Sequence, residues 1–290
     1  METPSSFHQF YLHQYIIRFK VIGVFEMPNF ETDYIKSILG LAIQQKFGAN
    51  SKIGEAMFDA RNENKSVRPP YIIRNVLPAK PFILTGDFLS FELILFGNFN
   101  TELHALLPAI ELMAENMRDE NCTITFFSIH ELGIPDVSDE VKFSPKKIIK
   151  LQNPITYGLF KDISFKEEEI TFRFESPVCN TNFKDDLQGF NFYKIVFDLA
   201  STLNLLASTY GVGEKVDIDL WCEDAKHIKP ESISLKRWEQ ERSKGHVLHG
   251  HTGIINYSGR FNRYLPLLYF GQWIHIGKNT SLGCGKYSIE

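Results

Sequence analysis

The residues best suited to proton-transfer chemistry are three of the nine histidines, which lie within six residues: His246, His249 and His251. An imidazole exchanges protons near neutral pH, so at least one of them is a candidate general acid or base. If the segment is extended, His249 and His251 point to the same face, which would also suit a metal pair, although no further ligands follow at a suitable spacing. Hydrogen-bonded or solvent-facing histidines are the alternative interpretation.

Glycines and lysines characterise the C-terminal segment that follows His275. Glycine lets the backbone approach a ligand closely, and backbone N–H groups beside a lysine suit phosphate oxygens. The spacing matches neither G-x-x-x-x-G-K-[ST] nor a G-x-G-x-x-G between a strand and a helix. A phosphate-binding loop and a glycine-rich turn before a last strand are both compatible with it. The candidate binding residues are Gly277, Lys278, Asn279, Gly283, Gly285 and Lys286, with Arg260 and Arg263 just upstream.

Charge is distributed unevenly along the 290 residues. The formal net charge is −4, yet residues 226–290 hold ten Lys/Arg and four Asp/Glu, so the residues before them carry −10. A polyanion would therefore bind to the last fifth of the chain. Hydrophobic residues make up 43% of the chain, which excludes an intrinsically disordered protein. The length allows one large domain or two of about 140 residues.

The four cysteines and the apolar runs exclude several further classes of protein. The cysteines form no C-x-x-C pair, so neither a zinc knuckle nor a redox dithiol is predicted. No apolar run approaches the ~20 residues of a membrane helix, and the first eight residues lack the features of a signal peptide. No motif of a serine hydrolase or a two-metal nuclease is present. We expect a cytoplasmic protein without a membrane segment, a metal site or a cofactor.

The elements that must position these residues follow one order in the first half of the chain. Apolar alternation and helical spacing predict a strand at 10–25, a helix at 35–47, strands at 71–74 and 89–95, a helix at 103–117 that Thr101 could cap, and a strand at 123–132. The stretch 133–150 has the composition of a linker with an entry strand to the second half.

The same order returns in the second half. We predict a strand at 170–174, a helix at 192–206 that ends before Gly211, strands at 216–221 and 249–257, a helix at 263–274 and a closing strand at 283–289. Two copies of βαββαβ predict an α+β protein with two ferredoxin-like domains, at residues 1–140 and 141–290. RNA-recognition modules use this topology as well.

Several motifs are spread over most of the chain. They are Arg68-Pro-Pro-Tyr71, Pro81-Phe-Ile-Leu84, the run from Gly86 to Gly97 with the Leu106-Leu-Pro-Ala-Ile110 helix, Ser176-Pro177, Gly250-x-Thr-Gly-x-x-x-Tyr-x-Gly259, Tyr264-Leu-Pro-Leu-Leu268 and the glycine-rich run from His275 to Tyr287. With these motifs the chain resembles the CRISPR-associated precursor-crRNA-processing endoribonucleases of the RAMP superfamily, most strongly from about residue 245 onward.

This resemblance implies tandem ferredoxin-like domains and metal-independent cleavage of CRISPR repeat RNA in precursor crRNA. The 2′-hydroxyl of the RNA would attack the adjacent phosphate and leave a 2′,3′-cyclic phosphate and a 5′-hydroxyl. The protein would supply a base, an acid and cationic or N–H groups for the charged phosphate, and the glycine-rich segment would hold the RNA backbone. The implied partners are CRISPR repeat RNA and crRNA, with other CRISPR effector subunits and a second copy of the chain as further candidates.

The sequence departs from the family pattern in one respect. Relatives often place a catalytic histidine in or just before the first helix, whereas residues 27–52 contain none and offer Tyr34, Lys36, Lys46 and Lys52. We hypothesise that one of the three clustered histidines takes this role. A Tyr/Lys pair is the alternative, and His13 is a further candidate. The remaining interpretations are a non-catalytic RAMP subunit that holds crRNA in an effector complex and a generic ligand- or protein-binding protein.

Overall fold

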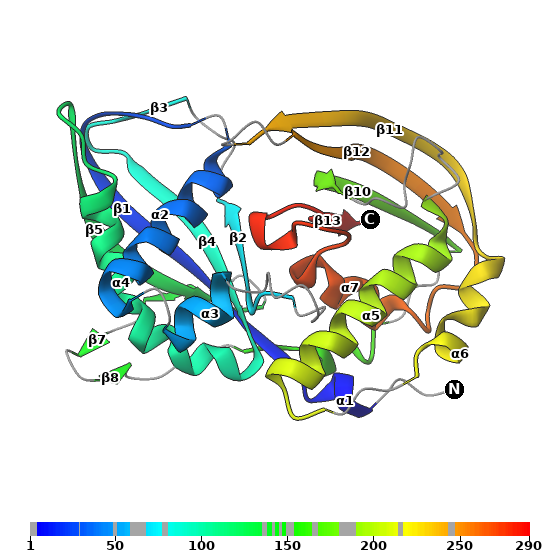
Figure 1. Cartoon of the computed structure of the whole chain (residues 1–290). Helices are drawn as coiled ribbons and strands as arrows, with labels where there is room; N and C mark the ends of the chain where they lie inside the picture. Colours follow the sequence, from blue (N-terminus) through cyan, green and yellow to red (C-terminus); the bar gives the residue numbers. More distant parts are fainter. Residues whose placement is uncertain are drawn as a thin grey trace. The chain divides into compact units, whose positions relative to one another are not determined.

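A computed structural model describes the chain except for residues 1–4, 29, 49–50, 59–67, 77–80, 135–137, 141–142, 145–146, 149–153, 164–167, 180–189, 214–216 and 243–246. The chain divides into two compact units (Figure 1). The first unit is Tyr11–Ile155, and the second unit combines Met1–Phe10 with Thr156–Glu290. The domain boundary expected between residues 140 and 141 stays a prediction.

The first unit is an antiparallel sheet covered on one face by helices (Figure 1). Its strands are β1 (Tyr11–Glu26), β2 (Tyr71–Asn75), β3 (Phe82–Leu84), β4 (Phe88–Phe96), β5 (Cys122–Leu132), β6 (Ser138–Glu140), β7 (Phe143–Ser144), β8 (Lys147–Ile148) and, at its end, β9 (Ile155–Thr156). Its helices are α2 (Glu31–Phe47), α3 (Lys52–Phe58) and α4 (Leu103–Asn116). The main strand order is β2-β4-β1-β5-β6, and β3 and β9 pair with β1. β7 and β8 pair with each other in a separate two-stranded sheet.

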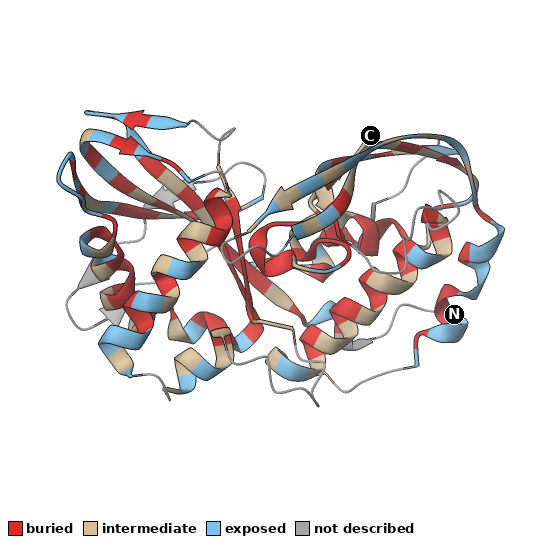
Figure 2. Cartoon of the chain, turned by 45° about the horizontal axis from the view of Figure 1, so that its top comes forward, coloured by how far each residue is buried: buried red, intermediate tan, exposed pale blue. Residues whose placement is uncertain are grey.

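The hydrophobic core of the first unit lies between its sheet and its helices, as the apolar periodicity of these elements predicts. Alternate residues of β1, such as Ile17 and Phe19, are fully buried with Ile35 of α2 and Ile110 of α4. Figure 2 shows the buried positions of the strands and helices in red. The expected cap at Thr101 is wrong, because residues Gly97–Glu102 form a 3₁₀ turn ahead of α4. The Thr101 hydroxyl donates to the Asn98 carbonyl at 2.8 Å instead.

The second unit repeats this architecture. Its strands are β10 (Glu169–Val178), β11 (Lys229–Glu241), β12 (Val247–Ser258) and β13 (Tyr287–Ile289), in the order β11-β12-β10-β13. Its helices are α1 (Ser5–His8), α5 (Phe192–Tyr210), α6 (Asp219–Cys222) and α7 (Leu265–Ile274). Each unit contains strand, helix, two strands, helix and strand, with the first strand between the third and the fourth. This is the ferredoxin-like arrangement, so the predicted fold class is confirmed.

The strand predicted at residues 216–221 is wrong. Its described part contains α6, whose turn begins where the Asp217 carboxylate accepts the Asp219 N–H at 3.0 Å. Trp221 is buried there, with its ring 5.3 Å from that of Tyr264. The second strand of this unit is β11, none of whose residues is buried. Among the described helices, none is long and apolar enough to cross a membrane.

Candidate nucleic-acid interface

The glycine-rich loop, residues 275–286, is attached to the C-terminal end of β10. The Lys278 N–H donates to the Cys179 carbonyl at 2.6 Å, and the Gly285 N–H donates to the Pro177 carbonyl at 2.9 Å. A carboxylate from α5 holds the start of the loop, since Asp198 accepts the Gly277 N–H at 2.8 Å. The loop is therefore positioned by both a strand end and a helix.

Glycine is required at two points of this loop. Gly277 has φ +86°, and a Cβ there would lie 2.6 Å from the Cys179 carbonyl oxygen. Gly285 has φ +78°, and a Cβ there would lie only 1.8 Å from the Ile276 carbonyl oxygen. A side chain at either position would push the backbone segments apart. The glycines thus let backbone pack against backbone inside the loop.

Side chains form hydrogen bonds with backbone groups inside the loop. His275 is fully buried, and its Nδ1 lies 3.0 Å from the Cys284 carbonyl, to which it donates. The Ser176 hydroxyl donates to the Gly283 carbonyl and accepts the Lys286 N–H, each at 2.7 Å. The backbone N–H groups of positions 277, 278, 285 and 286 are consequently engaged within the fold. The cationic side chains of the loop are therefore better candidates for contacting a phosphate than these four N–H groups.

The two lysines of the loop differ in their surroundings. Lys278 is exposed to solvent. The Lys286 ammonium is half-buried and lies 2.7 Å from the Glu175 carboxylate. Lys278 is therefore the more solvent-accessible cation of the pair.

A pair of cysteines links the loop to the end of β10, since Cys284 belongs to the loop and Cys179 follows the strand. Cys179 and Cys284 are both buried, and a hydrogen bond joins their thiols. This bond lowers the pKa of the Cys179 thiol and raises that of Cys284, which burial raises further.

The clustered histidines lie at the same end of the second sheet as the loop. His251 is opposite Val178 of β10, and His249 is opposite Glu239 of β11. The His249 side chain is 58% exposed, and its Nδ1 lies 3.2 Å from the Glu239 carboxylate. The ring of His251 is edge-on to Phe190 at 5.6 Å. His246 lies outside the described residues.

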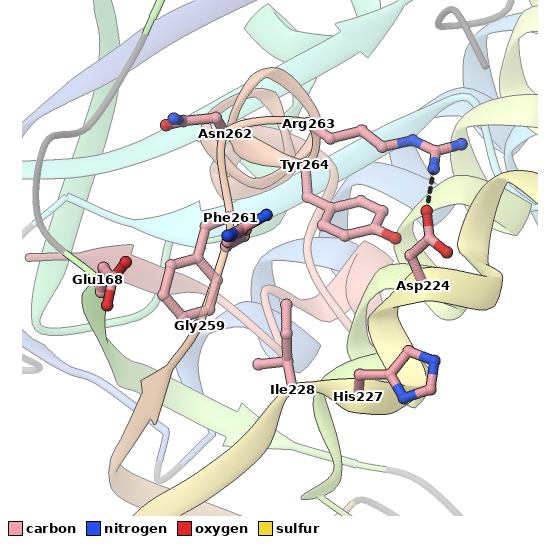
Figure 3. A pocket seen from close by; sticks show the side chains of 10 residues that line it. Glu168, Asp224, His227, Ile228, Gly259, Phe261, Asn262, Arg263 and Tyr264 are labelled. Atoms are coloured by element: carbon pink, nitrogen blue, oxygen red, sulfur yellow. Dashed lines mark hydrogen bonds and ion pairs between the residues drawn. The ribbon is translucent and has the colours of Figure 1, made fainter.

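Arg260 and Arg263 lie at the opposite end of this sheet, because they follow Ser258, which pairs with Glu169 at the start of β10. The ten residues of β10 separate the two ends by about 30 Å. Arg263 donates to Asp224 at 2.6 Å (Figure 3). Its guanidinium also lies over the rings of Trp221 and Tyr264. A pocket of about 770 Å³ opens here, lined by Glu168, Asp224, His227, Ile228, Gly259, Arg260, Phe261, Asn262, Arg263 and Tyr264.

The alternative catalytic residues are on the first unit. Tyr34 and Lys36 are half-buried on α2, and their two-residue spacing directs them to different sides of the helix. Burial, with Asp119 and Cys122, raises the pKa of Tyr34, so this phenol is a proton donor rather than a base. The Lys36 ammonium lies 5.7 Å from the centre of the Tyr71 ring.

His13 is more buried than the expected half-buried position, with 6% exposure. Its Nδ1 contacts the buried Glu131 carboxylate, and its ring stacks on Tyr15. No group of three or more His, Cys, Asp or Glu side chains among the described residues could hold a metal ion. Within the second unit, the geometry therefore brings together the loop, His249 and His251, and it places Arg260 and Arg263 at the other end of the sheet.

Sequence reasoning missed the residues that support this set. Asp198 lies in α5, where the apolar stripe identifies the buried positions but gives no signal for this carboxylate. Glu239 lies in β11, a strand that the sequence pattern does not predict. Recognising β11 as the partner of β12 would have placed Glu239 opposite His249, because the register pairs them directly.

A family model of the CRISPR-associated endoribonuclease Cas6 matches residues 172–287. This range includes most of the second sheet, both of its long helices and the whole glycine-rich loop. None of the curated protein sequences matches this chain.

Solved structures share the fold over almost the whole chain. A partial Cas6-RT-Cas1--Cas2 complex matches with 15% identity and a TM-score of 0.63, over 97% of this chain and 46% of that one. Thermus thermophilus Cas6 matches with 13% identity and a TM-score of 0.57, over 97% and 99%. A Cas6 product complex matches with 11% identity and a TM-score of 0.59, over 96% and 100%.

The present chain spans about half the length of the first of these chains. The predicted resemblance to the CRISPR-associated precursor-crRNA-processing endoribonuclease family is confirmed, because a family model of the endoribonuclease Cas6 matches residues 172–287.

Proposed function

We propose that this chain is an endoribonuclease that cleaves CRISPR repeat RNA within precursor crRNA. The observation that carries this proposal is the family match over residues 172–287, which includes both β12 with its histidines and the loop that fixes the end of β10. Other Cas proteins are proposed as partners, because one similar chain is part of a Cas6-RT-Cas1--Cas2 complex.

The proposed reaction is a metal-independent transesterification. The 2′-oxygen of the RNA forms a bond to the adjacent phosphorus as its proton passes to a base, and the bond to the 5′-oxygen breaks as an acid protonates that oxygen. Negative charge builds up on the phosphate oxygens in between, where the exposed Lys278 ammonium would stabilise it. The products are a 2′,3′-cyclic phosphate and a 5′-hydroxyl.

His249 is the strongest candidate for the base. The Glu239 carboxylate accepts from its Nδ1, which leaves Nε2 as the acceptor of the 2′-hydroxyl proton. Its side chain is exposed, whereas His251 packs against Phe190. Tyr34 remains the alternative proton donor on the first unit.

The test is a cleavage assay in EDTA with end-labelled repeat RNA from the chain's own locus. We expect a single cut with cyclic phosphate ends. His249→Ala should lower the single-turnover rate about 100- to 10,000-fold, as expected for loss of a general base. Glu239→Gln should retain RNA binding, lower the rate by a smaller factor and change the pH profile.

His227→Ala is the matched control, because this exposed histidine lines the pocket at the far end of the sheet. Cleavage by His249→Ala at the rate of His227→Ala would exclude His249 as the base. Loss of cleavage upon removal of divalent cations would contradict the metal-independent mechanism.

A second candidate function is a non-catalytic subunit that holds crRNA in an effector complex. The observation that favours it is α2, which contains no histidine. This function predicts salt-dependent binding of repeat RNA without any cut in the same assay.

A further inference from the structure

Two phenylalanine rings lie in contact on the surface of the first unit. Phe88 of β4 and Phe127 of β5 have ring centres 4.8 Å apart at an interplanar angle of 52°, and they remain 41% and 54% exposed. They lie on the face of the sheet opposite the helices, since the alternate residues Leu89 and Phe126 pack toward the core. Contiguous apolar side chains on an exposed surface are typical of binding sites, whereas single exposed apolar residues are common on any surface.

A β-bulge contributes one of the two rings. Along the pairing of β1 with β5, Arg18 is opposite Ser128 and Phe19 is opposite Phe126, which leaves Phe127 as the extra residue. A bulge bends its strand and redirects a side chain. The ring centres of the neighbouring Phe126 and of Phe19 lie 5.9 Å apart, in an edge-on arrangement. Phe127 instead contacts the ring of Phe88, which lies on the other side of β1.

Two cationic residues of β1, the strand between β4 and β5, lie next to the ring pair. Lys20 of β1 is directly opposite Phe88 on one side and Thr125 on the other, and it is exposed. Arg18 shares the same face two residues earlier. Neither forms an ion pair with another described residue.

A third ring extends this surface. Phe82 of β3 is 52% exposed and is opposite Glu26 of β1, on the same face of the sheet. Among the described residues, the exposed phenylalanines are these three. We call Lys20, Phe82, Phe88 and Phe127 the aromatic patch. Exposed aliphatic side chains adjoin it: Ile22, Val24 and Leu84.

We propose that the aromatic patch binds single-stranded RNA by stacking bases on Phe88 and Phe127, with Lys20 and Arg18 contacting phosphates. Every base has a π-face, so stacking on exposed rings suits an unpaired strand of any sequence, and nearby cations neutralise its backbone. The inference rests on the proposed function only in that the chain handles RNA. It adds a second RNA contact, on the unit that does not contain the glycine-rich loop.

The test is fluorescence anisotropy of the full chain with a labelled, unstructured RNA of about ten nucleotides, alongside the repeat RNA. Phe88→Ala and Phe127→Ala should each weaken binding of the short RNA about 5- to 100-fold. Phe127→Trp should retain affinity, because its larger ring also stacks. Lys20→Ala should reduce the salt dependence by about one phosphate contact.

Leu84→Ala is the matched control, because it removes an equally exposed apolar side chain from the same face without removing a ring. Equal affinity of both phenylalanine variants and the wild type would overturn the inference. So would an equal loss with Leu84→Ala, or a changed oligomeric state in sedimentation, both of which would identify a hydrophobic protein-docking surface.

The cleavage assay separates failure of this inference from failure of the proposed function. Normal binding and cleavage by the phenylalanine variants would overturn the aromatic patch alone. A wild-type chain that binds neither RNA would overturn both.

Discussion

Among the glycines that the structure describes, Gly285 is the one where an added Cβ would make the shortest contact. Its φ of +78° is in the left-handed region, and a Cβ would lie 1.8 Å from the Ile276 carbonyl oxygen, 2.8 Å from its carbon and 2.9 Å from its nitrogen. Gly285→Ala therefore cannot be accommodated by rotating a side chain. The loop backbone itself must move.

The expected cost follows from two effects. The left-handed conformation costs alanine roughly 1–2 kcal/mol. Lengthening the 1.8 Å contact to at least 3.0 Å breaks two backbone hydrogen bonds, from Ile276 to Gly285 at 3.0 Å and from Gly285 to Pro177 at 2.9 Å. Each is worth about 0.5–1.5 kcal/mol. We therefore expect Gly285→Ala to lower the free energy of unfolding by about 2–5 kcal/mol.

Urea denaturation followed by tryptophan fluorescence measures this change in the relevant unit, because all three tryptophans, Trp221, Trp238 and Trp273, lie in the second unit. Gly259→Ala is the matched control. It also has a positive φ, +146°, but its Cβ would meet only the Ile228 side chain. A loss for Gly285→Ala no larger than that for Gly259→Ala would refute the reasoning.

Three further predictions concern charge and burial. Burial raises the pKa of Glu31 from 4.5 to about 7, so the folded state binds this proton more tightly and stability falls as pH rises through that interval. In urea titrations Glu31→Gln should match the wild type below pH 4.5 and exceed it at pH 8, and parallel pH profiles would contradict this. Arg263→Ala should lower the free energy of unfolding by about 1 kcal/mol, because it removes the contacts of Arg263 with the Trp221 ring and with Asp224. Lys278→Ala, which removes an exposed cation, should weaken RNA binding more than it lowers stability. A loss of RNA binding only in the Arg263 variant, or a loss of stability only in the Lys278 variant, would contradict this in anisotropy and melting experiments. Burial, with Asp219, raises the pKa of Cys222 to about 12, so mass spectrometry should find this thiol unalkylated at pH 8 unless urea is added.

The order of elements was predictable wherever one face of an element is buried. The alternation in β1 and the helical stripe of α5 correspond to buried residues, and both elements were expected close to their observed bounds. The prediction failed for β11, which has no buried residue and is held by pairing with β12 along twelve positions. An exposed strand has no apolar alternation, so its sequence does not reveal it.

The candidate site was predictable in composition but not in arrangement. The glycines and His249 were identified from residue type, yet only the register of β10 and β12 reveals that Arg260 and Arg263 lie at the far end of the sheet. The role of Asp198 also depends on tertiary structure, because 79 residues separate it from the Gly277 N–H that it accepts. Contacts between distant segments are not contained in local patterns.

The central claim is that the chain cuts repeat RNA with the RNA's own 2′-hydroxyl as nucleophile. The most direct test compares, in EDTA, the repeat RNA with versions carrying a single 2′-deoxy substitution at each position. The account predicts one cut that disappears only when the nucleotide immediately 5′ of the scissile phosphate is deoxy. A cut that persists in every deoxy RNA would contradict it.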